Sequence, residues 1–303
     1  MAVVYWQGVG STVSVGDFWG QGGNPDGYWS SEPADGDTAV IGRGSEVIAG
    51  DPTPLVELAE LRIGHGFTGT IGSELATLVV KAYGPSGAFI INSRGDVHLT
   101  LTDDSALAKS GKLIVDVASG TVTIQDNRTL SQKPTSYTHT VEVIMRSSSS
   151  AVTIAQPSGG GQPNYTMVVA TGPAGSQLTL VGATAADIYT DGCDVLGGTA
   201  TNDWFLASGD IEPEGADSLI LYSGTATPGL HGGGGDFGYL ELNGGWLDLS
   251  AVESVTTFPG GWGDFETYMG KVSMEDAQPI VNRGVVSIDV VGGITLNIES
   301  AES

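Results

Sequence analysis

Positive charge is the scarcest feature of this sequence. Between Arg146 and Lys271 there is no lysine or arginine, whereas the same stretch carries fourteen acidic residues, from Asp187 to Glu266. The whole chain has 11 basic and 35 acidic residues and a formal net charge of -24. Nucleic-acid binding needs clustered lysines and arginines that neutralise phosphates, so we expect no nucleic-acid partner. Such a surface suits hydration, cation binding or contact with a basic partner.

Cysteine is nearly absent too. Cys193 is the single cysteine of the chain, which excludes an intrachain disulfide framework. Asp191 and Asp194 stand beside it, and nearby carboxylates raise the pKa of a thiol. We therefore expect Cys193 to be a buried, unreactive thiol rather than a nucleophile.

Long apolar runs are missing as well. No stretch of eighteen apolar residues occurs, and the first ten residues, MAVVYWQGVG, lack both the basic and the apolar region of a secretory signal. We accordingly expect no membrane partner, and a chain that stays in the cytoplasm or leaves it as part of a particle.

Helical periodicity is scarce, and the best helical candidate is the short stretch 54–61. Short β-type runs recur instead, with Gly, Asn, Asp or Ser between them about every ten residues. This pattern predicts an all-β protein. The runs lie at residues 78–80, 88–91, 97–101, 113–117, 121–124, 141–145, 151–154, 167–170, 178–181, 219–222, 239–242, 285–290 and 294–298.

Several segments share one arrangement, in which an alternating run, a glycine or asparagine turn and another alternating run follow one another. Examples are SGKLIVDVASGTVTIQD (110–126) and GYLELNGGWLDLS (238–250). Such segments favour coils that stack, as in a right-handed parallel β-helix or other β-solenoid. A β-sandwich or jelly roll is the alternative, since these folds also use short strands. We expect a tryptophan-rich cap or docking segment at 1–50, a solenoid body at 51–230 and final coils at 231–303.

The most specific segment covers residues 5–41. It carries Trp6, Trp19 and Trp29, followed by Pro33, Gly36-Asp37 and the apolar triplet Ala39-Val40-Ile41. This opening resembles that of β-helical phage virion proteins and of autotransporter-like passengers. Autotransporters would need an export signal and a C-terminal membrane barrel, which we do not find in this sequence, so the phage-type resemblance is favoured.

The tryptophans have two candidate roles. Trp6, Trp19 and Trp29 are expected to cap or dock the open end of the solenoid, because an uncovered end exposes apolar surface and strand edges. A platform for carbohydrate stacking is the alternative. Trp246 and Trp262 lie in a glycine-rich aromatic segment (232–270) that would form a partner-binding surface or the core of a late coil.

Motifs that carry chemistry are absent. The sequence has no G-x-S-x-G elbow, H-E-x-x-H, P-loop or C-x-x-C, and its four histidines stand far apart. We expect no catalytic residue and no cofactor. The acidic clusters are interpreted as solvated turns; Asp187, Asp191 and Asp194 are the candidates for a Ca²⁺ site, and acid and base roles of the glycosidase type are the remaining alternative.

Together these observations predict a non-enzymatic structural protein of a phage-like virion, assembled in the host cytoplasm. The expected role is capsid decoration and stabilisation, or a short head fibre, through binding to the major capsid protein or other virion proteins and to itself as a homo-oligomer. The alternative is a tail-associated adhesin or depolymerase that recognises a host surface polysaccharide.

Overall fold

The structure is a computed structural model, and every regular element it describes is a β-strand. It describes residues 2–7, 29–31, 33–50, 56–83, 88–102, 112–128, 140–156, 164–182, 184–198, 203–207, 209–213, 216–221, 223–227, 235–242, 246–248, 255–257, 265–267, 271–273, 280–282, 289–290 and 295–297. The chain divides into a first unit, Met1–Thr166, and a second unit, Met167–Ser303. In the described part, no helix is long and apolar enough to cross a membrane.

The first unit contains twelve complete described strands. They are β1 (Val3–Tyr5), β2 (Asp37–Gly44), β3 (Val47–Ile48), β4 (Glu57–Phe67), β5 (Thr70–Ile71), β6 (Leu78–Ala82), β7 (Ala88–Ser93), β8 (Val97–Thr102), β9 (Lys112–Val117), β10 (Thr121–Asp126), β11 (Thr140–Met145) and β12 (Ala151–Ala155). Strand β13 (Asn164–Thr171) crosses the division.

The second unit continues with shorter strands. They are β14 (Gln177–Val181), β15 (Thr184–Asp191), β16 (Asp194–Gly198), β17 (Asp203–Ala207), β18 (Ile211–Pro213), β19 (Ala216–Leu221), β20 (Thr225–Ala226), β21 (Gly235–Leu242), β22 (Trp246–Asp248), β23 (Val255–Thr257), β24 (Phe265–Thr267), β25 (Lys271–Ser273), β26 (Ile280–Asn282), β27 (Asp289–Val290) and β28 (Thr295–Asn297).

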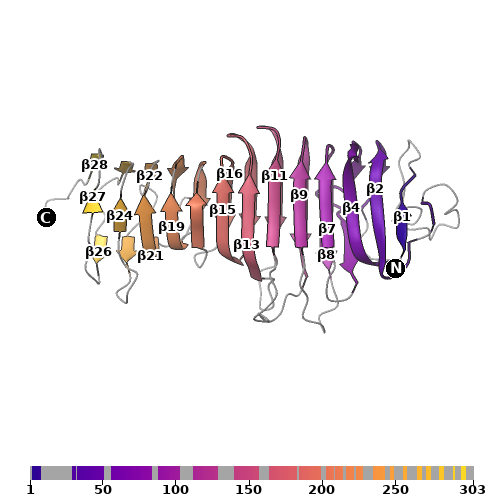
Figure 1. Cartoon of the computed structure of the whole chain (residues 1–303), viewed down its shortest axis with the longest axis horizontal. Helices are drawn as coiled ribbons and strands as arrows, with labels where there is room; N and C mark the ends of the chain where they lie inside the picture. Colours follow the sequence, from indigo (N-terminus) through magenta and orange to yellow (C-terminus); the bar gives the residue numbers. More distant parts are fainter. Residues whose placement is uncertain are drawn as a thin grey trace. The chain divides into compact units, whose positions relative to one another are not determined.

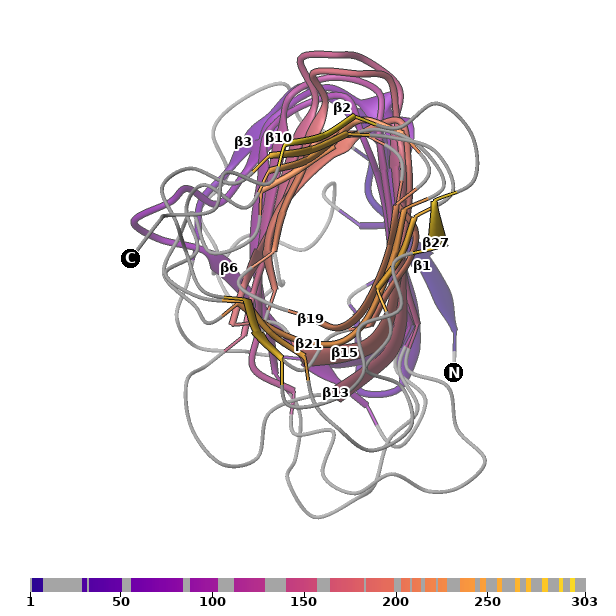
Figure 2. The same ribbon diagram turned by 90° about the vertical axis from the view of Figure 1, so that its left-hand side faces the viewer.

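Parallel pairing between successive coils defines the first unit. Strands β1, β2, β4, β7, β9 and β11 form one column (Figure 1). Strands β8, β10 and β12 form another. Seen end on, these strands surround the interior of the unit (Figure 2). This arrangement is a parallel β-solenoid, which confirms the all-β prediction. The sandwich and jelly-roll alternatives are wrong, because both are built from antiparallel sheets.

Inward side chains stack in register along the solenoid. Ile41, Ile63, Ile91, Val115 and Val143 are neighbours in successive strands, and each is fully buried. Strand alternation places one such residue at every second position, which is the pattern that the short apolar runs predict. Each fully buried aliphatic side chain contributes about 1.5–3 kcal/mol, so these columns hold successive coils together.

The second unit has the same kind of buried column, but its coils are shorter. Leu178, Val195, Ile211 and Ala226 form a buried column through β14, β16, β18 and β20. The backbone N–H of Thr225 donates a hydrogen bond to the side chain of Asp210, which lies 15 positions earlier. The backbone N–H of Thr121 donates to the side chain of Asp96, which lies 25 positions earlier. The coil length therefore changes along the chain, which explains the irregular period of the sequence.

Glycine makes the tight corners between strands. Gly209 has φ +105, and a Cβ added there would lie 2.2 Å from the carbonyl oxygen of Cys193 in the preceding coil. Gly224 follows one coil later, with φ +81, and a Cβ there would lie 2.1 Å from the oxygen of Gly209. Side chains are excluded at these corners both by the backbone conformation and by the stacked coil.

The stretch 54–61, the best helical candidate in the sequence, is a strand from Glu57 onward. Leu58 and Leu61 both belong to β4 and both are buried. Asp37 pairs with Leu58 and Thr38 with Glu60, so Ala59 is an extra residue in a β-bulge. The bulge brings two leucines three positions apart onto the inward side, and this spacing imitates a helical period.

Candidate functional site

Trp6 and Trp29 close the first described coil. Their rings meet edge to face with centroids 5.4 Å apart, and each residue is 3% exposed. Ser30 pairs with the backbone of Tyr5 in β1. Its backbone N–H donates to the Tyr5 carbonyl oxygen (2.8 Å), and its Oγ accepts from the Tyr5 backbone N–H (2.9 Å). Neither ring therefore offers an exposed face for carbohydrate stacking, and the cap role of these residues stays a prediction.

The outer side of β1 is apolar. Val3 and Tyr5 point away from the core and are 52% and 54% exposed, whereas Val4 between them is fully buried. The strand thus presents two large side chains to solvent at the first coil.

Of the other candidate tryptophans, the structure places Trp246. Trp246 begins β22, where it pairs with Thr225 and Lys271. Trp19 and Trp262 lie outside the described residues. The partner-binding role of the 232–270 segment therefore stays a prediction.

A buried charge network lies at the end of β10. Arg128 is 2% exposed and makes two side-chain hydrogen bonds to Asp126, at 2.8 and 2.7 Å. The Tyr165 hydroxyl donates to the same carboxylate at 2.7 Å, and the Arg128 guanidinium lies 5.3 Å from the ring centroid of Phe89. These partners satisfy a carboxylate that is fully removed from water.

Burial and pairing act on Asp126 in opposite directions. Burial alone would raise the pKa of Asp126, but the charge and hydrogen bonds of Arg128, with the Tyr165 bond, hold the pKa below its usual value. Burial and the Asp126 charge raise the pKa of Tyr165 well above its usual value. The carboxylate is therefore ionised and the phenol neutral at neutral pH, which is the protonation that the hydrogen bond requires.

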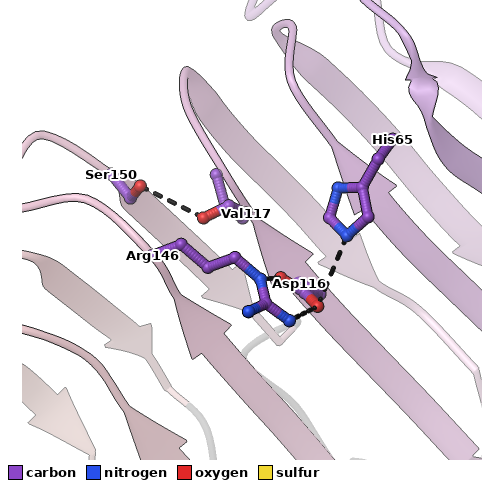
Figure 3. A network of polar contacts seen from close by, with 5 residues as sticks. All are labelled: His65, Asp116, Val117, Arg146 and Ser150. Carbon is purple, nitrogen blue, oxygen red and sulfur yellow. Dashed lines mark hydrogen bonds and ion pairs between the residues drawn. The ribbon is translucent and has the colours of Figure 1, made fainter.

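A second network lies on the outer surface of the first unit (Figure 3). Arg146, just after β11, makes two hydrogen bonds of 2.6 Å to Asp116 of β9. His65 of β4 approaches the same carboxylate from the other side, with Nε2 3.5 Å from Asp116 Oδ2. Since β7 lies between β4 and β9, the three side chains tie four successive strands together.

The Asp116 carboxylate is ionised at neutral pH. Burial by itself raises the pKa of Asp116, but the hydrogen bonds and charge of Arg146, with a smaller contribution from His65, outweigh it and lower the pKa. The network links neighbouring coils, because Arg146 and His65 reach the same carboxylate from strands on either side of it.

The candidate calcium ligands are only partly brought together. Asp191 ends β15 and Asp194 begins β16, at one corner, whereas Asp187 lies four residues earlier in the same strand. Four residues of strand span about 13 Å, which separates Asp187 from that corner. Among the residues whose side chains the structure describes, no group of three or more His, Cys, Asp or Glu is placed to hold a metal ion.

Cys193 lies at the same corner and is fully buried. Burial raises the pKa of its thiol to about 11, and the charges of Asp194 and Asp191 add to the effect. The thiol is therefore protonated and unreactive at neutral pH, in agreement with the interpretation of the sequence.

Neither charge network was identified from the sequence. The interpretation as solvated turns concerned the acidic clusters between residues 187 and 236 and gave no role to Asp126, which occupies an inward position of β10, where Val122 and Ile124 precede it at alternate positions. A carboxylate at an inward position of an alternating strand requires a partner, and Arg128 two residues later is the nearest one in the sequence. Tyr165 and Arg146, the partners from other coils, lie 39 and 30 positions from their carboxylates, so no nearby sequence pattern identifies them.

No family model, curated protein or solved structure was found to match this chain.

Proposed function

We propose that this chain is a non-enzymatic structural protein of a phage-like virion. Its solenoid decorates and stabilises the capsid, or forms a short head fibre, by binding the major capsid protein or other virion proteins and further copies of itself. The observation that carries the proposal is that buried carboxylates link neighbouring coils. Asp116 accepts hydrogen bonds from Arg146 and Asp126 accepts one from Tyr165, and both donors lie beyond the strand of their acceptor.

The parallel solenoid supports this role mechanically. In a solenoid each coil contacts only its neighbours, so resistance to bending and pulling depends on the links between coils. Here those links are apolar columns, the backbone bonds of parallel strands, and the two networks on Asp116 and Asp126. Such links favour a stiff first unit, which suits a protein whose task is to reinforce or to project.

The first coil supports a docking role at the N-terminal end. The resemblance to β-helical virion proteins lies in residues 5–41, and in the described part of that segment Trp6 and Trp29 are buried and pack edge to face. The adjacent Val3 and Tyr5 are exposed and apolar. We place the contact with the shell on this end, where apolar burial can stabilise association without requiring positive charge.

Charge distribution agrees with the proposed orientation. Nine of the 11 basic residues lie within residues 1–146, and the stretch from 147 to 270 has none. An acidic outward part keeps a crowded particle surface soluble through mutual repulsion.

Immunogold labelling tests the proposal. Antibodies raised against the purified protein should decorate intact particles from the culture that carries its gene, and preadsorption with the protein should abolish the labelling. Particles that remain unlabelled, although the protein is detected in the soluble fraction of the same lysate, would contradict it.

A further inference from the structure

The outer face of the first unit is electrically balanced in a strongly acidic chain. We define this face by the outward side chains within residues 60–65, 88–92, 112–116 and 140–146, on β4, β7, β9 and β11 and at Arg146 just after β11. Its six charged residues form three ion pairs: Arg62 with Glu60 (2.8 Å), Lys112 with Glu142 (4.0 Å) and Arg146 with Asp116 (2.6 Å). The face therefore has no net charge with His65 neutral, while the chain carries -24.

One row of this face has a symmetric pattern. Strand register places Arg62 beside Ile90, Ile90 beside Ile114, and Ile114 beside Glu142. Both isoleucines are only partly buried, because they lie on the outward side of their strands. The row thus reads cation, isoleucine, isoleucine, anion. Neighbouring strands are about 4.8 Å apart, so roughly 14 Å separates the two charged ends.

When a second copy of this row faces the first in the opposite direction, each cation meets an anion and each isoleucine meets an isoleucine. We propose that two copies of the chain pack face to face through the outer face, around a two-fold axis that runs parallel to the strands between β7 and β9. In this arrangement Ile90 of one copy packs on Ile114 of the other, and Arg62 meets Glu142 of the second copy at both ends. The proposal specifies the self-association in the proposed function and rests on it.

The net charge of the chain indicates that the partner at this outer face is a second copy of the chain. Two chains of -24 repel each other through most surfaces, and a balanced face is where they can approach within the Debye length, about 10 Å at 0.1 M salt. An isologous contact requires that one patch be complementary to itself. The order Arg62, Ile90, Ile114, Glu142 meets that requirement, whereas an unrelated basic partner would favour an acidic patch.

A charge swap tests the arrangement. The purified full-length protein is studied by multi-angle light scattering and sedimentation velocity at 0.15 M salt. Arg62→Glu places two carboxylates opposite each other and Glu142→Arg places two cations, so each single variant should weaken dimerisation by about tenfold or more. The double variant Arg62→Glu/Glu142→Arg restores opposite charges across the interface and should restore the dimer.

The control variant makes the same change in net charge at a residue outside the face. Arg94 is exposed in the turn after β7 and lies outside the face, so Arg94→Glu should leave the dimer intact. Far-UV circular dichroism establishes that each variant is folded. A second test mixes Ile90→Cys with Ile114→Cys chains: a mixed disulfide should form under mild oxidation, and the buried Cys193 should not contribute to it.

Three results would overturn the proposal: a wild-type protein that stays monomeric at 100 μM, a dimer that Arg94→Glu weakens as much as Arg62→Glu, or a double variant that stays monomeric while folded. These outcomes are separable from failure of the proposed function. A monomeric chain that still labels particles would reject the dimer alone, and a dimer with no particle association would reject the virion role alone.

Discussion

Tyr165 donates a hydrogen bond to Asp126 Oδ2 at 2.7 Å, although 39 positions separate the two residues in the chain. The same carboxylate binds Arg128, which is itself buried. One ionised side chain thus holds together β10, the segment that follows it and β13. We expect substitutions at Asp126 to be strongly destabilising, because removing the carboxylate takes an ion-pair partner from a buried arginine.

Asp126→Asn should destabilise the protein by about 3–5 kcal/mol, because the buried Arg128 guanidinium would lose its ion pair with the Asp126 carboxylate. Urea unfolding followed by tyrosine and tryptophan fluorescence measures the effect. As a control, Asp126→Leu combined with Arg128→Met removes both charges and should recover most of the stability. A loss below about 1 kcal/mol in the single variant would mean that the ion pair is not buried.

Asp116→Asn should lower the melting temperature at pH 7, since Arg146 and His65 stabilise the ionised carboxylate. The folded-state pKa of Asp116 is depressed, so its contribution is present above the unfolded pKa of about 3.9 and is lost as the pH falls through the folded pKa. Melting curves of wild type and variant should therefore converge at low pH. A difference that stays constant from pH 7 to pH 2.5 would rule out the ionic contribution.

Gly209→Ala should destabilise the second unit by more than about 1 kcal/mol, because φ is +105 and the added Cβ would meet a backbone oxygen at 2.2 Å. Gly42→Ala is the matched control: a Cβ at Gly42 meets nothing within 4 Å. Thermal unfolding of the two variants gives the comparison. Equal stability of both would contradict the tight corner at Gly209.

Cys193 should resist modification in the native protein, since burial raises the pKa of its thiol to about 11. A chromogenic disulfide reagent at pH 8 should react slowly with the native protein and fully in 6 M guanidinium chloride. Complete labelling of the native protein within minutes would show that the thiol is accessible.

The strands could be predicted from the sequence because the alternation that buries them is local. Val122 and Ile124, or Val141, Val143 and Met145, identify inward positions without any knowledge of their neighbours. Strand β4 could not be predicted in this way, because the bulge at Ala59 gave Leu58 and Leu61 a helical spacing.

The candidate sites depended on information that the local sequence does not contain. Arg146 and Asp116 are 30 positions apart, and the coil length that brings them together changes from about 25 to 15 residues along the chain. With a variable coil length, the register of one strand does not fix the register of the next. The cap role predicted for Trp6, Trp19 and Trp29 rests on the general requirement that an open solenoid end be covered, and the sequence does not predict that Trp6 packs against Trp29.

Reconstitution on particles measures the proposed role most directly. Particles from a strain that lacks the gene are mixed with the purified protein and sedimented through a density gradient, and the bound protein is quantified against the major shell protein. We expect saturable binding at a fixed ratio, and no oligosaccharide release when the same protein is incubated with host surface glycans. Protein that stays at the top of the gradient at saturating concentration, or that cleaves the glycans, would contradict the assignment as a structural virion protein.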